Sequence, residues 1–187
     1  MTRDLVERAR KGDHDAFAEL AGAAISRLDA TAWLMLRDSD RATDAVQVAL
    51  VRAWRSLPTL RDPDRFDAWL QRLLVNACID EIRHGRHHRR NVDVADMSNP
   101  PAVADAASAI ADRDQLERGF SRLEPEERAV IVLHHYLDLS LPEVAATLRI
   151  PLGTAKSRLY RGLKEMRAAL DADARPGPND IREGRTA

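Results

Sequence analysis

Apolar residues recur every three or four residues along two blocks of this chain, and a stretch without such a period separates the blocks. This spacing is that of one face of an α-helix, so both blocks are predicted to be helical throughout. Charged residues make up 32% of the chain and aromatic residues only 4%, a mixture typical of helical proteins and unfavourable for a β-sandwich. We therefore expect an all-α protein of two small helical domains joined by a flexible linker.

The domain boundaries follow from where the apolar period stops. Residues 91–111 combine several aspartates with Pro100, Pro101 and many alanines, so they are interpreted as an acidic linker. The N-terminal domain then spans residues 1–90, and the C-terminal domain spans residues 112–170. Residues 171–187 lose the apolar period and are expected to form a disordered tail.

The N-terminal domain is predicted to consist of helices with one prominent loop. A first helical period is kept by Phe17, Leu20, Ala24 and Leu28. A second helix runs from Arg41 to Leu57, where Pro58 ends it. The segment Pro58–Asp64 is predicted to be a loop. A long helix then begins at Phe66, turns Gln71 away from its apolar face, and continues into a cluster of arginines and histidines.

The C-terminal domain carries clearer helix boundaries. Pro125 followed by two glutamates is typical of a helix start, and Ser140 with Glu143 has the spacing of a capping box. The helix after Ser140 is only about nine residues long and ends at the segment Ile150–Gly153. A last helix follows. Two helices joined by a tight turn containing Gly153 form a helix-turn-helix pattern.

Charge is informative only when it is counted by segment. The chain has 29 basic residues against 30 acidic ones, and this net charge of −1 gives no sign of a polyanionic partner. From Arg149 to Arg167, however, there are six basic residues and a single acidic one, Glu165. Basic and hydroxyl side chains at a helix start supply donors for phosphates and base edges, which favours DNA binding over an ordinary solvated helix. The candidate contacts are Thr154, Lys156, Ser157, Arg158, Arg161 and Lys164.

A second basic cluster lies at the end of the long N-terminal helix. Four arginines and three histidines fall within eight residues, which is more than the cations that a helix C-terminus ordinarily attracts. Contact with a phosphate backbone is therefore favoured over a solvated helix end. His84 and His88 have a spacing that could hold a metal, but no acidic or thiol ligand lies at a helpful spacing. No metal site is expected.

Other features exclude whole classes of function. Cys78 is the single cysteine, which excludes an internal disulfide and a thiolate metal cluster. The first residues lack the apolar core of a signal peptide, and no apolar run is long enough to span a membrane, so a cytoplasmic protein is expected. Glycine-rich phosphate loops and the motifs of serine hydrolases and zinc proteases are absent from the sequence. We expect neither an enzyme nor a cofactor nor a small-molecule substrate.

Several motifs resemble those of one known family. The segment Asp44–Trp54 (DAVQVALVRAW) resembles the polymerase-binding helix of sigma region 2, and Phe66–Arg83 resembles the promoter-melting helix that follows it. Leu123–Val130 (LEPEERAV) together with Pro151–Leu159 (PLGTAKSRL) resembles sigma region 4. Because both halves match in order, the chain is identified as a member of the extracytoplasmic-function (ECF) group of the sigma-70 family.

This resemblance implies that the chain directs core RNA polymerase to specific promoters and initiates transcription. Its partners would be core RNA polymerase, promoter DNA and an anti-sigma factor, which would hold it at the membrane only transiently. The implied polymerase-binding residues are Asp44, Gln47, Val48 and Arg52. The implied contacts to the downstream promoter element are Arg61, Arg65, Asn76, Asp80, Arg83, Arg86, Arg89 and Arg90. The recognition helix that begins near Thr154 would read the upstream element.

The chain departs from the family pattern at two positions. An acidic residue usually follows the glutamine at the position of Gln47, where this chain has Val48. Ala155 stands where the recognition helix usually has a valine.

Two other functions stay open on the residues alone. An autonomous helix-turn-helix regulator would explain the C-terminal domain but would leave the loop and basic helix end of the N-terminal domain without a role. A protein-interaction module would bind neither polymerase nor DNA. Run-off transcription with core RNA polymerase distinguishes all three functions.

Overall fold

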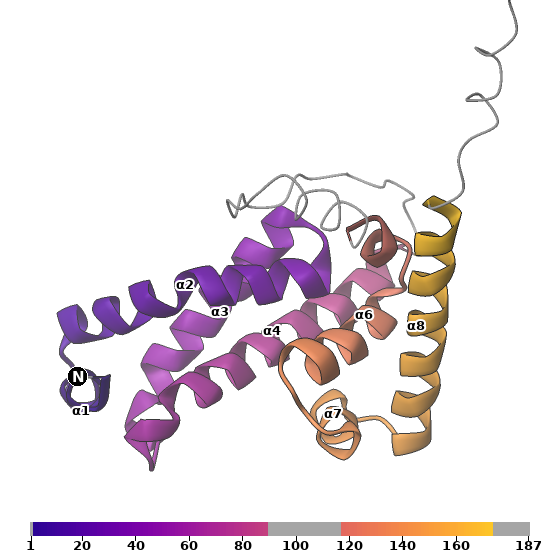
Figure 1. Ribbon diagram of the computed structural model, residues 1–187. Coiled ribbons are helices and arrows are strands. Elements are labelled where there is room, and N and C mark those ends of the chain that lie inside the picture. Colours follow the sequence, from indigo (N-terminus) through magenta and orange to yellow (C-terminus); the bar gives the residue numbers. More distant parts are fainter. Residues whose placement is uncertain (1, 90–116, 174–187) are drawn as a thin grey trace, which may run out of the picture. The chain divides into compact units, whose positions relative to one another are not determined.

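A computed structural model describes residues 2–89 and 117–173 of the chain, with the side chains of residues 86–89 and 172–173 excepted. Every regular element in these ranges is helical, which confirms the predicted all-α class (Figure 1). The chain divides into two compact units, of which the first carries α1–α4 and the second carries α6 and α8. The predicted linker, residues 91–111, lies outside the described residues.

The first unit is built from four α-helices and two short turns between the last two of them. The α-helices are α1 (Thr2–Arg10), α2 (His14–Leu36), α3 (Ser39–Ser56) and α4 (Phe66–Arg89). The turns are the 3-10 helices η1 (Leu57–Thr59) and η2 (Pro63–Arg65). α3 packs against both α2 and α4, and α1 packs against α2 and the two turns. The predicted end of α3 near Pro58 and the start of α4 at Phe66 are confirmed.

Aspartates fix where α2 and α3 begin. The Asp13 carboxylate accepts a hydrogen bond from the Ala16 amide at 3.0 Å, and Asp38 accepts one from the Arg41 amide at 3.0 Å. Each aspartate satisfies a backbone donor that the first helical turn leaves without a partner. The bond from Ala16 and a second one from Arg8 lower the pKa of Asp13. The helical period alone did not predict these starts.

The core of the first unit is apolar with one polar exception. Its largest fully buried side chains are Val6, Leu28, Met35, Leu57, Phe66, Leu70 and Leu74. The exception is Thr31, which donates to the Arg27 carbonyl at 2.9 Å and accepts from Gln71 Nε2 at 2.9 Å. Gln71 was predicted to point away from the apolar face of α4, and it is instead half-buried because Thr31 of α2 gives its amide a partner. Burial raises the pKa of the Cys78 thiol to about 12, so this cysteine is a core residue.

The second unit contains α6 (Pro125–Ile131), the π-helical turn η3 (Val132–Tyr136), α8 (Leu152–Asp173) and the first residues of α7 (Leu141–Leu148). Residues 117–121 form a further helical segment ahead of α6. The predicted start at Pro125 is confirmed, with proline in the first turn. Ser140 donates to the Glu143 carboxylate through its amide at 2.9 Å and through its hydroxyl at 2.6 Å, so the carboxylate half of the predicted capping box is present.

The turn between α7 and α8 differs from the prediction. Gly153 lies in the first turn of α8, and the left-handed residue that closes α7 is Arg149, with a φ of 54°. The amides of Arg149 and Ile150 donate to the Ala146 and Ala145 carbonyls at 3.2 Å and 3.0 Å. These two bonds satisfy the free carbonyls at the end of α7 in a Schellman motif, so the turn does not need glycine. The tight turn is therefore formed without Gly153.

Candidate functional site

α3 exposes a narrow face in which apolar and polar residues alternate. Val48 and Val51 are 42% and 49% exposed, and Asp44 and Gln47 are exposed beside them. Residues three and four apart share a helix face, so these four side chains form one strip, named here the α3 surface. The opposite side of the helix carries buried alanines and anchors α3 in the core. Single exposed valines are common, and two that adjoin on one helix face make this strip a candidate for contact with another protein.

Arg52, the fourth residue predicted to bind polymerase, is engaged within the unit. Its Nη1 and Nη2 atoms lie 3.1 Å and 3.2 Å from Asp80 Oδ2 on α4. Both side chains remain more than 40% exposed. Sequence analysis assigned Arg52 to polymerase and Asp80 to DNA, and the structure brings these two residues together.

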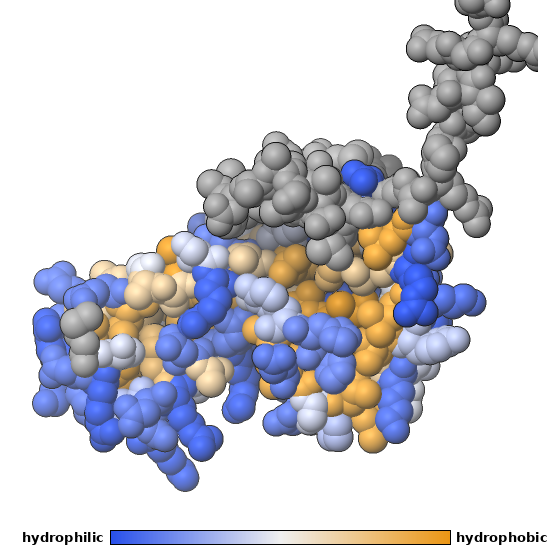
Figure 2. Space-filling view, viewed as in Figure 1, coloured by the Kyte–Doolittle hydropathy of each residue, from blue (hydrophilic) through white to orange (hydrophobic). Residues whose placement is uncertain are grey.

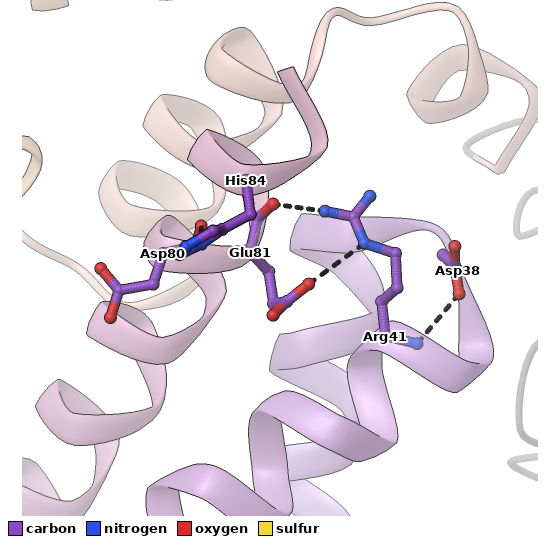
Figure 3. Close-up of polar contacts among 5 residues, drawn as sticks. All are labelled: Asp38, Arg41, Asp80, Glu81 and His84. Atoms are coloured by element: carbon purple, nitrogen blue, oxygen red, sulfur yellow. Dashed lines mark hydrogen bonds and ion pairs between the residues drawn. The ribbon is translucent and has the colours of Figure 1, made fainter. Parts of the chain in front are cut away.

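A second arginine ties α3 to the C-terminal part of α4 (Figure 3). Arg41 lies 3.3 Å from the Glu81 carboxylate through Nε, and it also donates to the Glu81 carbonyl. A Cβ atom on Gly85 would lie 2.7 Å from Arg41 Nη2, so only glycine lets the guanidinium approach the helix this closely. The Asp80 carboxylate points away from this cluster in Figure 3.

Sequence reasoning missed the roles of Arg41 and Glu81. The available signal was Gly85, because a glycine inside a helix costs about 1 kcal/mol relative to alanine and so suggests close packing. The cluster fixes α4 just before its run of arginines and histidines.

The predicted loop is held by buried residues at both of its turns. Leu57, Leu60 and Pro63 are buried, whereas the predicted contacts Arg61 and Arg65 are exposed. The Asp62 carboxylate accepts from the Asp64 amide at 3.1 Å, which orders the second turn. Arg3 of α1 donates to Asp64 at 2.7 Å. The loop therefore presents polar side chains from an anchored backbone.

The predicted polar face of α4 continues from this loop. Asn76 and Asp80 are half-buried and Arg83 is exposed. Arg86 and Arg89 lie in the last turns of α4, but their side chains are outside the described part of the structure, and Arg90 lies beyond it. The assignment of these residues to DNA stays a prediction.

α8 carries its predicted contacts on several sides of one helix. Lys156, Ser157, Arg161 and Lys164 are exposed, and Thr154 and Arg158 are half-buried. Ala155 between them is fully buried and anchors the first turn. Figure 2 shows hydrophilic side chains along α8, at the right-hand edge of the view. This surface offers mainly hydrogen-bond donors and positive charge, the chemistry that phosphates attract.

Two of these side chains already make contacts inside the unit. The Ser157 hydroxyl donates to the Thr154 carbonyl at 3.0 Å. Arg161 Nε lies 3.4 Å from Oε1 of Glu127 on α6. Glu127 was interpreted from sequence only as an acid at a helix start, yet it is buried.

The described residues lack both a cluster of metal ligands and a helix that could span a membrane. No group of three or more metal-ligating side chains gathers within residues 2–89 and 117–173. Within the same ranges, no helix has the length and apolarity that a membrane span requires.

Comparisons with known proteins decide the family. The family model for sigma-70 region 2 matches residues 21–88, and the one for sigma-70, region 4 matches residues 113–166. The chain is 33% identical over 152 residues to the RNA polymerase sigma-E factor of Streptomyces coelicolor, which covers 80% of this chain and 84% of that protein. This chain is an ECF sigma factor of the sigma-70 family.

Solved structures agree with this family. The structure of CnrH in complex with the cytosolic domain of CnrY matches with a TM-score of 0.57 and 28% identity, over 92% of this chain and 99% of that chain. The sigma factor RpoE in complex with the anti-sigma factor NepR from Bartonella quintana shares the fold, with a TM-score of 0.63 and 24% identity over 84% and 98% of the two chains. This chain, as an ECF sigma factor, is thus an RNA polymerase subunit that acts in transcription initiation.

Proposed function

We propose that the α3 surface is where this sigma factor binds core RNA polymerase. The single observation that carries this assignment is the exposure of Val48 and Val51 next to Asp44 and Gln47. When a protein partner covers exposed valines, their burial stabilises the complex by about 25 cal/mol per Å² of apolar area. Polar neighbours fix the orientation of such a contact. Arg52 adds to this surface while its guanidinium remains bound to Asp80.

α8 is assigned to the upstream promoter element. Its exposed face offers lysine, arginine and serine side chains over about two helical turns, which suits a helix that lies in the major groove. Arginine can bind guanine through two parallel hydrogen bonds, whereas lysine acts on phosphates as a point charge. Arg158 and Arg161 are therefore the candidates for base readout. Lys156 and Lys164 are the candidates for backbone contacts.

The anchored loop and the polar face of α4 are assigned to the downstream element. Reading single-stranded DNA requires a base to leave the stack, at a cost of a few kcal/mol. A loop whose backbone is already ordered loses less conformational entropy when it binds such a base. Arg61 and Arg65 extend from this loop, and Asn76, Asp80 and Arg83 follow on α4. Arg86, Arg89 and Arg90 would hold the adjacent phosphates.

The domain boundaries proposed with these roles are those of the sequence interpretation. Residues 1–90 bind polymerase and the downstream element, residues 112–170 bind the upstream element, and residues 91–111 connect them. An anti-sigma factor is the proposed inhibitor, since RpoE, which shares the fold, was solved with such a partner. The protein is proposed to act in the cytoplasm and to have no catalytic activity of its own.

Run-off transcription tests this function directly. Core RNA polymerase transcribes a pool of genomic DNA fragments with and without the full-length protein, and the transcript starts are sequenced. The expected result is a set of new starts that share two short elements at a constant spacing. If the starts match those of core polymerase alone, the proposed function is wrong.

A further inference from the structure

The ion pair between α6 and α8 joins one buried and one exposed partner. The side chain of Glu127 is only 5% exposed, whereas that of Arg161 is 62% exposed. The pair uses Oε1 of the glutamate and Nε of the arginine, 3.4 Å apart. Oε2 of Glu127 is also buried and has no hydrogen-bond partner within the described part of the chain. A half-satisfied buried carboxylate is costly, so its presence calls for a reason.

Close packing of the two helices brings this carboxylate to α8. A Cβ atom on Gly162 would lie 2.8 Å from Ile131 Cδ1 and 3.3 Å from Glu127 Cβ, so glycine lets α8 approach α6 at this turn. Arg161 precedes Gly162 in the chain, and its side chain extends from the edge of this contact. The buried Glu127 carboxylate therefore approaches the Arg161 guanidinium from the interior of the unit, not from solvent.

The geometry leaves the outer part of the guanidinium available. A contact through Nε does not use the two Nη groups, and these form one edge of the planar fork that binds guanine or phosphate. A side chain as long as arginine samples many rotamers when nothing holds it. The fixed carboxylate restricts that freedom before DNA binds.

The charged groups around Glu127 come from both helices. Burial raises the pKa of the carboxyl group most, Glu165 of α8 raises it further, and Arg161 lowers it; at Glu124, a backbone hydrogen bond lowers the pKa more than the charge of its carboxylate raises it. Arg161 is the positively charged group in this set. The favourable charge contact of Glu127 is thus with the DNA-facing arginine.

We propose that Glu127 is a positioning residue that holds Arg161 in the orientation in which α8 reads the upstream element. This inference rests on the proposed assignment of α8 to DNA. Glu127 itself does not contact the DNA, and it acts through Arg161 alone. A purely structural ion pair would tie α6 to α8 without affecting promoter choice.

The variant Glu127→Gln separates positioning from a general effect of charge, because the two predict effects of opposite sign, whereas a purely structural ion pair predicts no change in promoter discrimination. Glutamine keeps the size of the side chain, so the unit should remain folded, which circular dichroism checks. Removal of a negative charge near DNA should strengthen binding if charge alone matters. Loss of positioning should weaken it, by about twofold or more. The assay is promoter binding by the full chain reconstituted with core polymerase, using a promoter found by run-off transcription and versions changed in the upstream element.

Matched variants complete the experiment. Glu124→Gln removes the same charge from an exposed position three residues away, and it should leave promoter discrimination unchanged. Arg161→Ala should lower affinity for the correct upstream element, and the double variant with Glu127→Gln should be no weaker than Arg161→Ala alone. Arg161→Lys keeps the charge but lacks Nε, so it should lose discrimination while keeping affinity for unrelated DNA.

Three outcomes would overturn the proposal. The first is promoter binding by Glu127→Gln that is as tight as that of the wild type or tighter. The second is normal promoter binding by Arg161→Ala, since there is then no contact to position. The third is promoter discrimination by Arg161→Lys that equals that of the wild type. None of these results would affect the sigma-factor function, which depends on the appearance of new transcript starts.

Discussion

α3 and α8 both bury an apolar face, but their exposed faces differ in chemistry. α3 exposes two valines beside an acid and an amide, whereas α8 exposes lysines, arginines and a serine in addition to Leu152, Tyr160 and Leu163. The first face suits a protein partner that covers apolar area, and the second suits a polyanion. A net charge of −1 does not reveal this contrast, because acidic residues elsewhere in the chain balance the basic residues of α8. The exposed face of each helix, rather than the total charge, indicates its partner.

The two units also differ in how their arginines are used. In the first unit, four ion pairs join separate elements: Arg3–Asp64, Arg27–Asp67, Arg41–Glu81 and Arg52–Asp80. On α8, the described residues give one ion pair, that of Arg161 with Glu127. These four arginines therefore link elements of the first unit to one another, while most cations of α8 make no ion pair within the described residues. Substitutions on α3 and on α8 test this difference.

The largest effect is expected on the α3 surface. Asp44→Arg places a cation beside Val48 and should abolish association with core polymerase, because the loss of a central interface contact costs about 2 kcal/mol or more. The helical fold should be unchanged, since Asp44 is exposed. Co-purification with tagged core polymerase measures the effect.

The matched control is Glu19→Arg, which makes the same charge change at an exposed position of α2. It should leave core association intact. If Asp44→Arg co-purifies as well as Glu19→Arg does, the α3 surface is not the polymerase contact.

The next effect is expected on α8. Arg158→Ala should lower affinity for the preferred upstream element by about 5- to 150-fold, since a bidentate arginine contributes about 1 to 3 kcal/mol of base discrimination. Lys156→Ala should instead weaken binding to all sequences alike and reduce the salt slope by about one. Holoenzyme binding to promoters with changed upstream elements measures both. Uniform losses in both variants would make Arg158 a phosphate contact, and α8 would then read no base through it.

The features that sequence predicted are those set by neighbouring residues. Helix period, proline and capping signals predicted α4, α6 and α8, because each depends on residues within a few positions of one another. The exposure of Lys156, Ser157, Arg161 and Lys164 on α8 was predictable for the same reason, and their contact with DNA stays a prediction. The left-handed Arg149 was not, because arginine rarely adopts this conformation and the glycine nearby suggested another turn.

Contacts across helices could not be predicted in the same way. The apolar periods of α3 and α4 predict which face of each helix is buried. They do not predict that Arg52 contacts Asp80, which lies 28 positions further along the chain. Glu127 has the sequence environment of any acid at a helix start, and only the packing of α8 buries it. Such pairs depend on helix packing, which a one-dimensional pattern does not contain.

The buried glutamate gives the second unit a pH response. Burial raises the pKa of Glu127 above its ordinary value of 4.5, so the folded state favours the protonated form. Its contribution to stability is therefore complete below pH 4.5 and is lost as the pH rises through the raised pKa. Glu127→Gln does not titrate, so its stability relative to the wild type should increase from acid to neutral pH. Urea unfolding of both proteins across this range measures the difference, and a constant difference would contradict the raised pKa.

The smallest effect is expected for the pair that joins α3 to α4. Arg52 and Asp80 are 45% and 42% exposed, so water and salt weaken their attraction, and the pair should contribute only about 0.2 to 1 kcal/mol to stability. A double-mutant cycle with Arg52→Ala and Asp80→Ala, measured by urea unfolding, gives this coupling, which should fall further in high salt because the pair is exposed. A coupling of zero would mean that Arg52 is as available to a ligand as the cations of α8. The contrast between the arginines of the two units would then rest on the three remaining pairs that join elements of the first unit, Arg3–Asp64, Arg27–Asp67 and Arg41–Glu81.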